Sequence, residues 1–71
     1  MHIGSVIRKL RKERKMTLLE LSQKSGVALG SLSRIENGKM PGTVKSHESI
    51  CKVLDITLPE LYIQLPSSKR T

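Results

Sequence analysis

The sequence predicts an all-α fold, a compact domain of five short helices, and three observations support this prediction. Apolar residues recur at helical spacing in several consecutive segments of a chain of 71 residues. Each segment is bounded by residues that cap or stop helices, such as a threonine with a glutamate three residues later, or a glycine. No segment shows the sustained alternation of apolar and polar residues that marks a strand.

The first predicted helix covers residues 2–15. Its apolar side chains recur at spacings of three and four residues and form one stripe: Ile3, Val6, Ile7 and Leu10. The other faces carry six basic side chains: Arg8, Lys9, Arg11, Lys12, Arg14 and Lys15. Such a run is most often a solvated face. A basic amphipathic helix can also lie on a membrane, but this one has no bulky aromatic anchor, so membrane binding is not expected.

The second predicted helix begins after Thr17, which forms a capping box with Glu20. It should end at Ser25-Gly26, because glycine easily adopts the left-handed conformation that a tight turn requires. The third helix is predicted to start near Ala28 and to continue through residues 36 or 37. Only three or four residues link the two helices, so they should cross steeply rather than pack antiparallel.

Two further helices follow a loop that contains Pro41 and Gly42. Thr43 is predicted to cap a fourth helix that ends at Leu54. Its apolar face combines Val44, His47, Ile50, Cys51 and Leu54. Thr57 begins a second capping box, and the short fifth helix should extend to about Gln64. We therefore predict one domain over residues 1–65, with residues 66–71 as a flexible tail or the start of a linker.

The composition narrows the possible functions. The net charge of +7 and the isoelectric point of about 10.1 favour a polyanionic partner, with nucleic acid first. The chain has no Trp or Phe and one Tyr, so modules that stack bases on aromatic rings are not expected. A single cysteine fits a reducing compartment. With no signal peptide and no membrane-spanning run, we expect a cytoplasmic protein that does not bind membranes.

No pattern predicts catalysis, a metal site or a cofactor. His47 and Cys51 lie four residues apart and could face one metal ion, but two ligands do not make a site, so core packing is the favoured interpretation. No nucleophile motif or glycine-rich phosphate loop is present. We expect that the protein is not an enzyme and has no cofactor.

Six segments carry a recognisable pattern in their residues and spacing: Met16-Thr17, Glu20-Leu21, Gly26-Val27, Leu32-Ser33-Arg34-Ile35-Glu36, Gly38-Lys39 and Thr57-Leu58-Pro59-Glu60-Leu61. In these segments the sequence resembles the Cro and phage-repressor type (XRE-like) helix-turn-helix family. The resemblance extends from about Ile3 to Tyr62. The resemblance implies a five-helix domain with a helix-turn-helix unit at about residues 18–37, whose third helix lies in the major groove of double-stranded DNA.

The implied function is sequence-specific binding of double-stranded DNA by a transcriptional regulator. A repressor that binds a two-fold operator as a homodimer is the favoured form, and the chain could also be the DNA-binding domain of a longer regulator. An antitoxin-type protein, which binds a toxin and regulates its own operon, is the alternative. The basic charge argues against a third possibility, a protein-interaction domain with no role in DNA binding.

The resemblance assigns base reading to five positions: Ala28, Leu29, Gly30, Ser33 and Arg34. Arg34 is the strong reader, because its forked guanidinium matches the O6 and N7 atoms of guanine. Leu29 could contact a thymine methyl or could pack in the core. Gly30 has no side chain but allows the backbone to approach the groove. Ala28 departs from the usual polar cap, so specificity should also depend on DNA shape.

The resemblance also assigns four phosphate contacts: Leu18, Asn37, Lys39 and Lys45. Leu18 departs from the family pattern, in which glutamine is frequent, and offers DNA only its backbone amide; the alternative is a partly buried packing residue. Arg11 and Glu36 match a pair that links the first helix to the end of the third, and the alternative is two exposed charges. A dimer surface is expected at the C-terminal end: Leu58, Leu61, Tyr62, Ile63 and Leu65.

Overall fold

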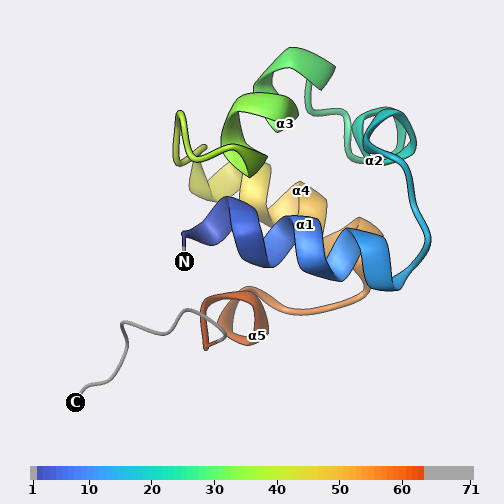
Figure 1. Ribbon diagram of the computed structural model, residues 1–71. Coiled ribbons are helices and arrows are strands. Elements are labelled where there is room, and N and C mark those ends of the chain that lie inside the picture. Colours follow the sequence, from blue (N-terminus) through green and yellow to red (C-terminus); the bar gives the residue numbers. More distant parts are fainter. Residues whose placement is uncertain (1, 64–71) are drawn as a thin grey trace.

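All regular structure is helical in the computed structural model, which describes residues 2–63. The helices are α1 (Ile3–Glu13), α2 (Leu18–Ser25), α3 (Leu29–Glu36), α4 (Val44–Leu54) and α5 (Leu58–Ile63). In Figure 1, α1 lies between α3 and α5, with α4 behind it. The prediction of an all-α fold with five helices is confirmed. The predicted end of the last helix at Gln64, the tail at 66–71 and Leu65 lie outside the described residues.

The three predicted threonine caps begin their helices as expected. Thr17 Oγ1 accepts a hydrogen bond from the Glu20 amide at 3.0 Å, and Glu20 Oε1 accepts one from the Thr17 amide at 2.9 Å. Thr57 and Glu60 form the same reciprocal pair at the start of α5. Thr43 caps α4 by accepting a hydrogen bond from the amide three residues later, at 3.1 Å. These bonds pair amides that lack partners inside the helix.

The predicted bounds of the first helix, residues 2–15, were too wide at both ends. His2 is the N-cap of α1, and its Nδ1 accepts a hydrogen bond from the Ser5 amide at 3.2 Å. At the other end, Arg14 is the C-cap and Lys15 adopts a left-handed φ of 54°. This conformation cannot continue a right-handed helix, so the chain turns toward α2 before the basic run has ended.

The core is aliphatic and receives side chains from all five helices. The buried apolar residues are Val6, Ile7, Leu10, Leu21, Leu32, Ile35, Ile50, Cys51, Leu54 and Leu61. Val44, predicted on the apolar face of α4, is instead 61% exposed, because it lies at the edge of that face and in the first turn. Gly4 is buried against α3, and a Cβ on it would overlap the carbonyl oxygen of Ile35. The sequence analysis did not identify this close approach.

His47 lies in the core and forms two hydrogen bonds. Its Nε2 lies 2.7 Å from the carbonyl oxygen of Pro41, and its Nδ1 lies 2.8 Å from the hydroxyl of Tyr62. A carbonyl can only accept, so Nε2 is the donor in the contact with Pro41. His47 therefore joins the α3–α4 loop to α5, and the prediction that His47 and Cys51 are core residues is confirmed. Among residues 2–63, no group of side chains could hold a metal ion.

The predicted dimer surface was partly wrong. Leu61 is fully buried in its own domain, because α5 packs against both α1 and α4. Leu58 and Tyr62 are half-buried against the same core, and Ile63 is 77% exposed. Of the predicted residues that the structure describes, three therefore remain available to a second copy.

Candidate nucleic-acid interface

The turn between α2 and α3 is held by hydrogen bonds within the turn itself. Gly26 ends α2 with a left-handed φ of 78°, as predicted, and three residues separate the two helices. Ser22 Oγ donates to the carbonyl of Val27 at 2.7 Å, and the Val27 amide donates to Ser25 Oγ at 3.2 Å. These bonds fix the direction in which α3 leaves the turn.

The C-terminal end of α3 is tied to α1 by a buried ion pair. Arg11 donates from Nε to Glu36 Oε2 at 2.8 Å and from a terminal nitrogen to Oε1 at 3.0 Å. The two side chains are only 11% and 5% exposed. Arg11 also donates to the carbonyl of Met16 at 2.8 Å. Arg11 and Glu36 therefore pair as the resemblance implied and are not two exposed charges, and the pair joins the end of α3 to the end of α1.

One face of α3 points away from the core along its whole length. Leu32, Ile35 and Glu36 are buried, and the residues on the opposite side share a spacing of three, four and seven: Gly30, Ser33, Arg34 and Asn37. We call these four residues the outer face of α3. A protein helix with such an exposed face has the size and shape that the major groove of DNA accepts.

The five predicted base-reading residues are all at least partly accessible. Arg34 is exposed on the outer face, and Ser33 is half-buried. Leu29 is 43% exposed, so the alternative that it packs in the core is wrong. Ala28 is the N-cap of α3, and its side chain makes no capping bond, as the sequence indicated. The start of α3 thus presents apolar groups and exposed backbone, whereas its last turn presents the Arg34 guanidinium.

The four predicted phosphate contacts differ in what they can offer. Leu18 is half-buried and packs against the core, which supports its interpretation as a packing residue. Its amide, in the first turn of α2, has no acceptor within the helix. Asn37 is exposed, but its side-chain amide donates to the carbonyl of Ser33 at 2.8 Å. Lys39 and Lys45 are exposed, so their ammonium groups can reach a ligand.

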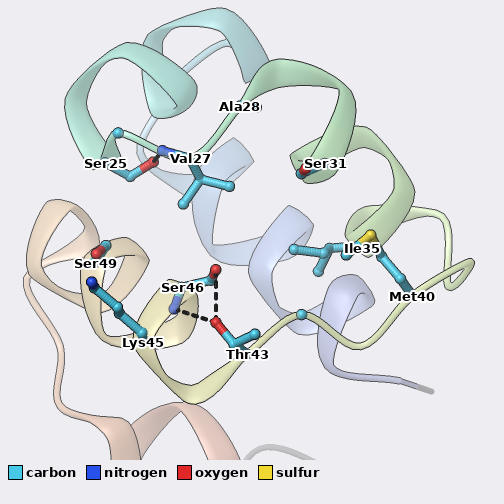
Figure 2. Close-up of a pocket in the computed structure, with 12 residues that line it drawn as sticks. Ser25, Val27, Ala28, Ser31, Ile35, Met40, Thr43, Lys45, Ser46 and Ser49 are labelled. Carbon is cyan, nitrogen blue, oxygen red and sulfur yellow. Dashed lines mark hydrogen bonds between the residues drawn. The ribbon is translucent and has the colours of Figure 1, made fainter.

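A cleft of about 290 Å³ separates the start of α3 from the start of α4 (Figure 2). Val27 and Ile35 point into it from the turn and from α3, and they form an apolar floor. Most of the accessible lining is apolar, and six of the lining residues carry a hydroxyl or an ammonium group: Ser25, Ser31, Thr43, Lys45, Ser46 and Ser49. The first turns of α3 and α4 therefore open onto the same hollow, with Lys45 as its positive charge.

The basic residues of α1 divide into two structural classes. Arg11 and Arg14 serve the fold: Arg14 Nε donates to the carbonyl of Leu54 at 2.8 Å and so caps the end of α4. The sequence analysis had treated Arg14 as part of a solvated run. Arg8, Lys9 and Lys12 are exposed on the side of α1 opposite its buried stripe. None of these three forms an ion pair within the described range.

Comparisons with known proteins agree with this architecture. The chain matches the model of a family described as "Helix-turn-helix" over residues 7–61. It is 43% identical over 54 residues to the HTH-type transcriptional repressor RghR of Bacillus subtilis (strain 168), a match that covers 70% of this chain and 40% of RghR. A second relative from that strain, the uncharacterized HTH-type transcriptional regulator RghRB, is 39% identical over 54 residues, which cover 70% of this chain and 39% of that protein. The chain thus spans about two fifths of the length of both relatives.

Two solved structures are also similar. A chain of a SinR–SinI protein complex superposes with a TM-score of 0.83 at 31% identity, over 97% of this chain and 68% of that chain. SinR in complex with DNA, described as the master regulator for biofilm formation, superposes with a TM-score of 0.80 at 36% identity, over 84% of this chain and 97% of that chain. Within the described residues, no helix is long and apolar enough to span a membrane.

Proposed function

The chain belongs to the helix-turn-helix family whose model it matches over residues 7–61, and we propose that it binds double-stranded DNA sequence-specifically as a transcriptional regulator, with repression as the favoured action. The observation that carries the proposal is the anchored, outward-facing α3. Its C-terminal end is fixed by the Arg11–Glu36 pair, and its outer face presents Arg34 to solvent. A fixed helix with an exposed guanidinium can place a bidentate donor against guanine in the major groove.

The elements around α3 suit contacts with the DNA backbone. Lys45 at the cleft and Lys39 after α3 would neutralise phosphates, and the free amides in the first turn of α2, including that of Leu18, would donate to another. A relative named as a repressor and a similar structure solved with DNA support the assignment. These relatives are regulators, so we keep DNA-binding regulation rather than an antitoxin role as the proposal.

We further propose that the protein acts as a homodimer on a two-fold site. Leu58, Tyr62 and Ile63 form an apolar edge on α5, with Leu58 and Tyr62 half-buried and Ile63 exposed. Two recognition helices would then lie one DNA turn apart, about 34 Å. Ile63→Glu should reduce dimerisation in sedimentation experiments, whereas Leu19→Glu, an exposed leucine on α2, should not. A selected DNA site without an inverted repeat would contradict the dimer.

Selection of bound duplexes from a random DNA pool tests the proposed function directly. Enrichment of one short motif is expected, and binding should weaken with salt at a slope of about −0.9 in log–log form per phosphate neutralised. No enriched motif, or binding that does not change between low and moderate salt, would refute the proposal.

Substitutions then separate base reading from phosphate contact. Arg34→Ala should lose about 1–3 kcal/mol on the selected duplex and relax the preference at one base pair per half-site. Lys39→Ala should weaken all duplexes about equally and lower the salt slope by about one unit. If Arg34→Ala weakens selected and random duplexes by the same factor, Arg34 contacts phosphate and the reading residues lie elsewhere.

A further inference from the structure

The start of α3 offers DNA almost no hydrogen-bonding side chain, although it lies at the exposed end of the outer face. Gly30 lies on the side of the helix opposite Leu32 and Ile35, which are buried. Leu29 beside it is 43% exposed, one of the few large apolar side chains that the described fold leaves in solvent. Ala28 precedes them and makes no side-chain capping bond. This end of the helix is therefore an apolar surface on which Leu29 carries the only large side chain among residues 28–30.

Nothing inside the domain accounts for glycine at position 30. A Cβ built there meets no atom within 4 Å, and its φ lies outside the left-handed range in which glycine is favoured. Gly4, the other helical glycine, contrasts with it, because a Cβ on Gly4 would collide with the backbone of α3. Glycine in a helix interior lowers stability relative to alanine. The missing side chain at Gly30 thus leaves space for something outside the domain.

Thymine is the base that suits an apolar surface in the major groove. It alone among the four bases presents a methyl group there, at C5. An isobutyl group can bury that methyl, while a bare backbone allows the helix to approach the base edges more closely than any side chain would.

We propose, on the basis of the DNA-binding function argued above, that the start of α3 selects thymine by apolar contact. Leu29 packs on the C5 methyl of one thymine in each half-site, and Gly30 admits the helix close enough for that contact. Arg34, one turn further along the outer face, donates hydrogen bonds to a guanine in the same half-site. Each half-site therefore combines one thymine read by its methyl group with one guanine read by hydrogen bonds.

Uracil substitution tests the contact one methyl at a time, on the duplex obtained by selection. Replacing each thymine by uracil removes the methyl and leaves base pairing unchanged. When the thymine at one position per half-site is replaced, the full chain should bind the uracil duplex about three- to fivefold more weakly than the thymine duplex, which is the loss expected for one buried methyl group. Leu29→Ala should bind the thymine and uracil duplexes equally. The control variant Leu19→Ala removes a different exposed leucine, which is 53% exposed on α2. This variant should still bind the thymine duplex more tightly than the uracil duplex.

Gly30→Ala provides a second, independent measurement. The melting temperature of the free protein should rise by about 4 °C, because alanine favours the helix and meets no neighbour. Affinity for the selected duplex should fall at least about tenfold, whereas affinity for random duplex should stay within about twofold. Higher stability with unchanged affinity would overturn the role of Gly30.

The outcomes distinguish this inference from the proposed function. If no motif is enriched, the proposed function fails. If a motif is enriched but uracil is tolerated at every thymine, or Leu29→Ala keeps the thymine preference, DNA binding stands and methyl reading is refuted. If Leu19→Ala abolishes the preference instead, α2 rather than α3 reads the methyl, and the inference is also refuted.

Discussion

Replacing Gly4 with alanine is the sharpest test of how α1 and α3 are packed. A Cβ on Gly4 would overlap the Ile35 carbonyl oxygen and lie 2.6 Å from its carbon and 2.8 Å from Glu36 Cα. Ordinary carbon–carbon contacts are about 3.5–4.0 Å, and the overlap with the oxygen is more severe, so the two helices must separate by at least about 1 Å. The obstacle is backbone on both sides, and no side chain can rotate away to relieve it.

The expected loss follows from this geometry. Overpacking a core usually costs about 1–3 kcal/mol, and here the separation also strains the Arg11–Glu36 bonds of 2.8 and 3.0 Å. We expect Gly4→Ala to lower the free energy of unfolding by about 3 kcal/mol. A domain of this size has a total stability of about 3–9 kcal/mol, so the loss would be a large fraction of it.

Urea unfolding followed by circular dichroism measures the effect. With a slope of about 1 kcal/mol per molar urea, the midpoint should fall by about 3 M, or the variant should be largely unfolded without denaturant. Gly30→Ala is the matched control, the same change in another helix, and it should raise the stability by about 0.5–1 kcal/mol. Shifts of the same sign in both variants would refute the packing argument.

Three further predictions concern polar contacts and the buried thiol. Arg11→Met should lower the free energy of unfolding by about 3 kcal/mol, because it leaves the Glu36 carboxylate buried without a partner. The control Arg8→Met should change that free energy by less than about 0.5 kcal/mol. Equal losses for the two variants in urea titrations would contradict this prediction. Hydrogen bonds from Thr17 and Thr57 lower the pKa of Glu20 and of Glu60 in the folded state. The unfolded chain therefore binds more protons than the folded protein in this pH range. The free energy of unfolding should fall as the pH drops below the usual pKa of glutamate and through the lowered pKa values. This loss should be smaller in the Glu20→Gln/Glu60→Gln double variant. Burial raises the pKa of the Cys51 thiol. Iodoacetamide should therefore alkylate the folded protein at least about tenfold more slowly than the unfolded chain at neutral pH. Similar alkylation rates would show that Cys51 is accessible in the folded protein.

The sequence was most informative where a feature depends on residues close together in the chain. Capping at Thr17, Thr43 and Thr57 involves contacts within three residues, so composition and spacing alone predict it. The end of α2 at Gly26 belongs to the same class, because the left-handed conformation is a local property of glycine. Most of the aliphatic core followed from helical periodicity for the same reason.

Features that join distant segments were missed or misjudged. Gly4 contacts residues about thirty positions away, and Arg14 caps a helix that ends forty residues later, so no local pattern marks either residue. Leu61 was expected on a dimer surface, but the packing of α5 against α1 and α4 buries it. The Arg11–Glu36 pair was predicted although the two residues lie 25 positions apart, because the resemblance to a known family supplied the partner.

The two ends of α3 are supported very differently, and this difference matters for recognition. The C-terminal end holds the Glu36 carboxylate, the close approach of Gly4 and a 2.8 Å bond from the Lys39 amide to the carbonyl of Arg34. The N-terminal end begins without a side-chain cap and borders an open cleft. Because the fold depends on the first end, residues 28–30 can change without loss of the domain, and reading specificity can change with them. Replacing an anchoring side chain such as Glu36 would instead tilt the whole helix and alter every contact together, so a local change of operator preference should arise at residues 28–30 or at the exposed Arg34 side chain.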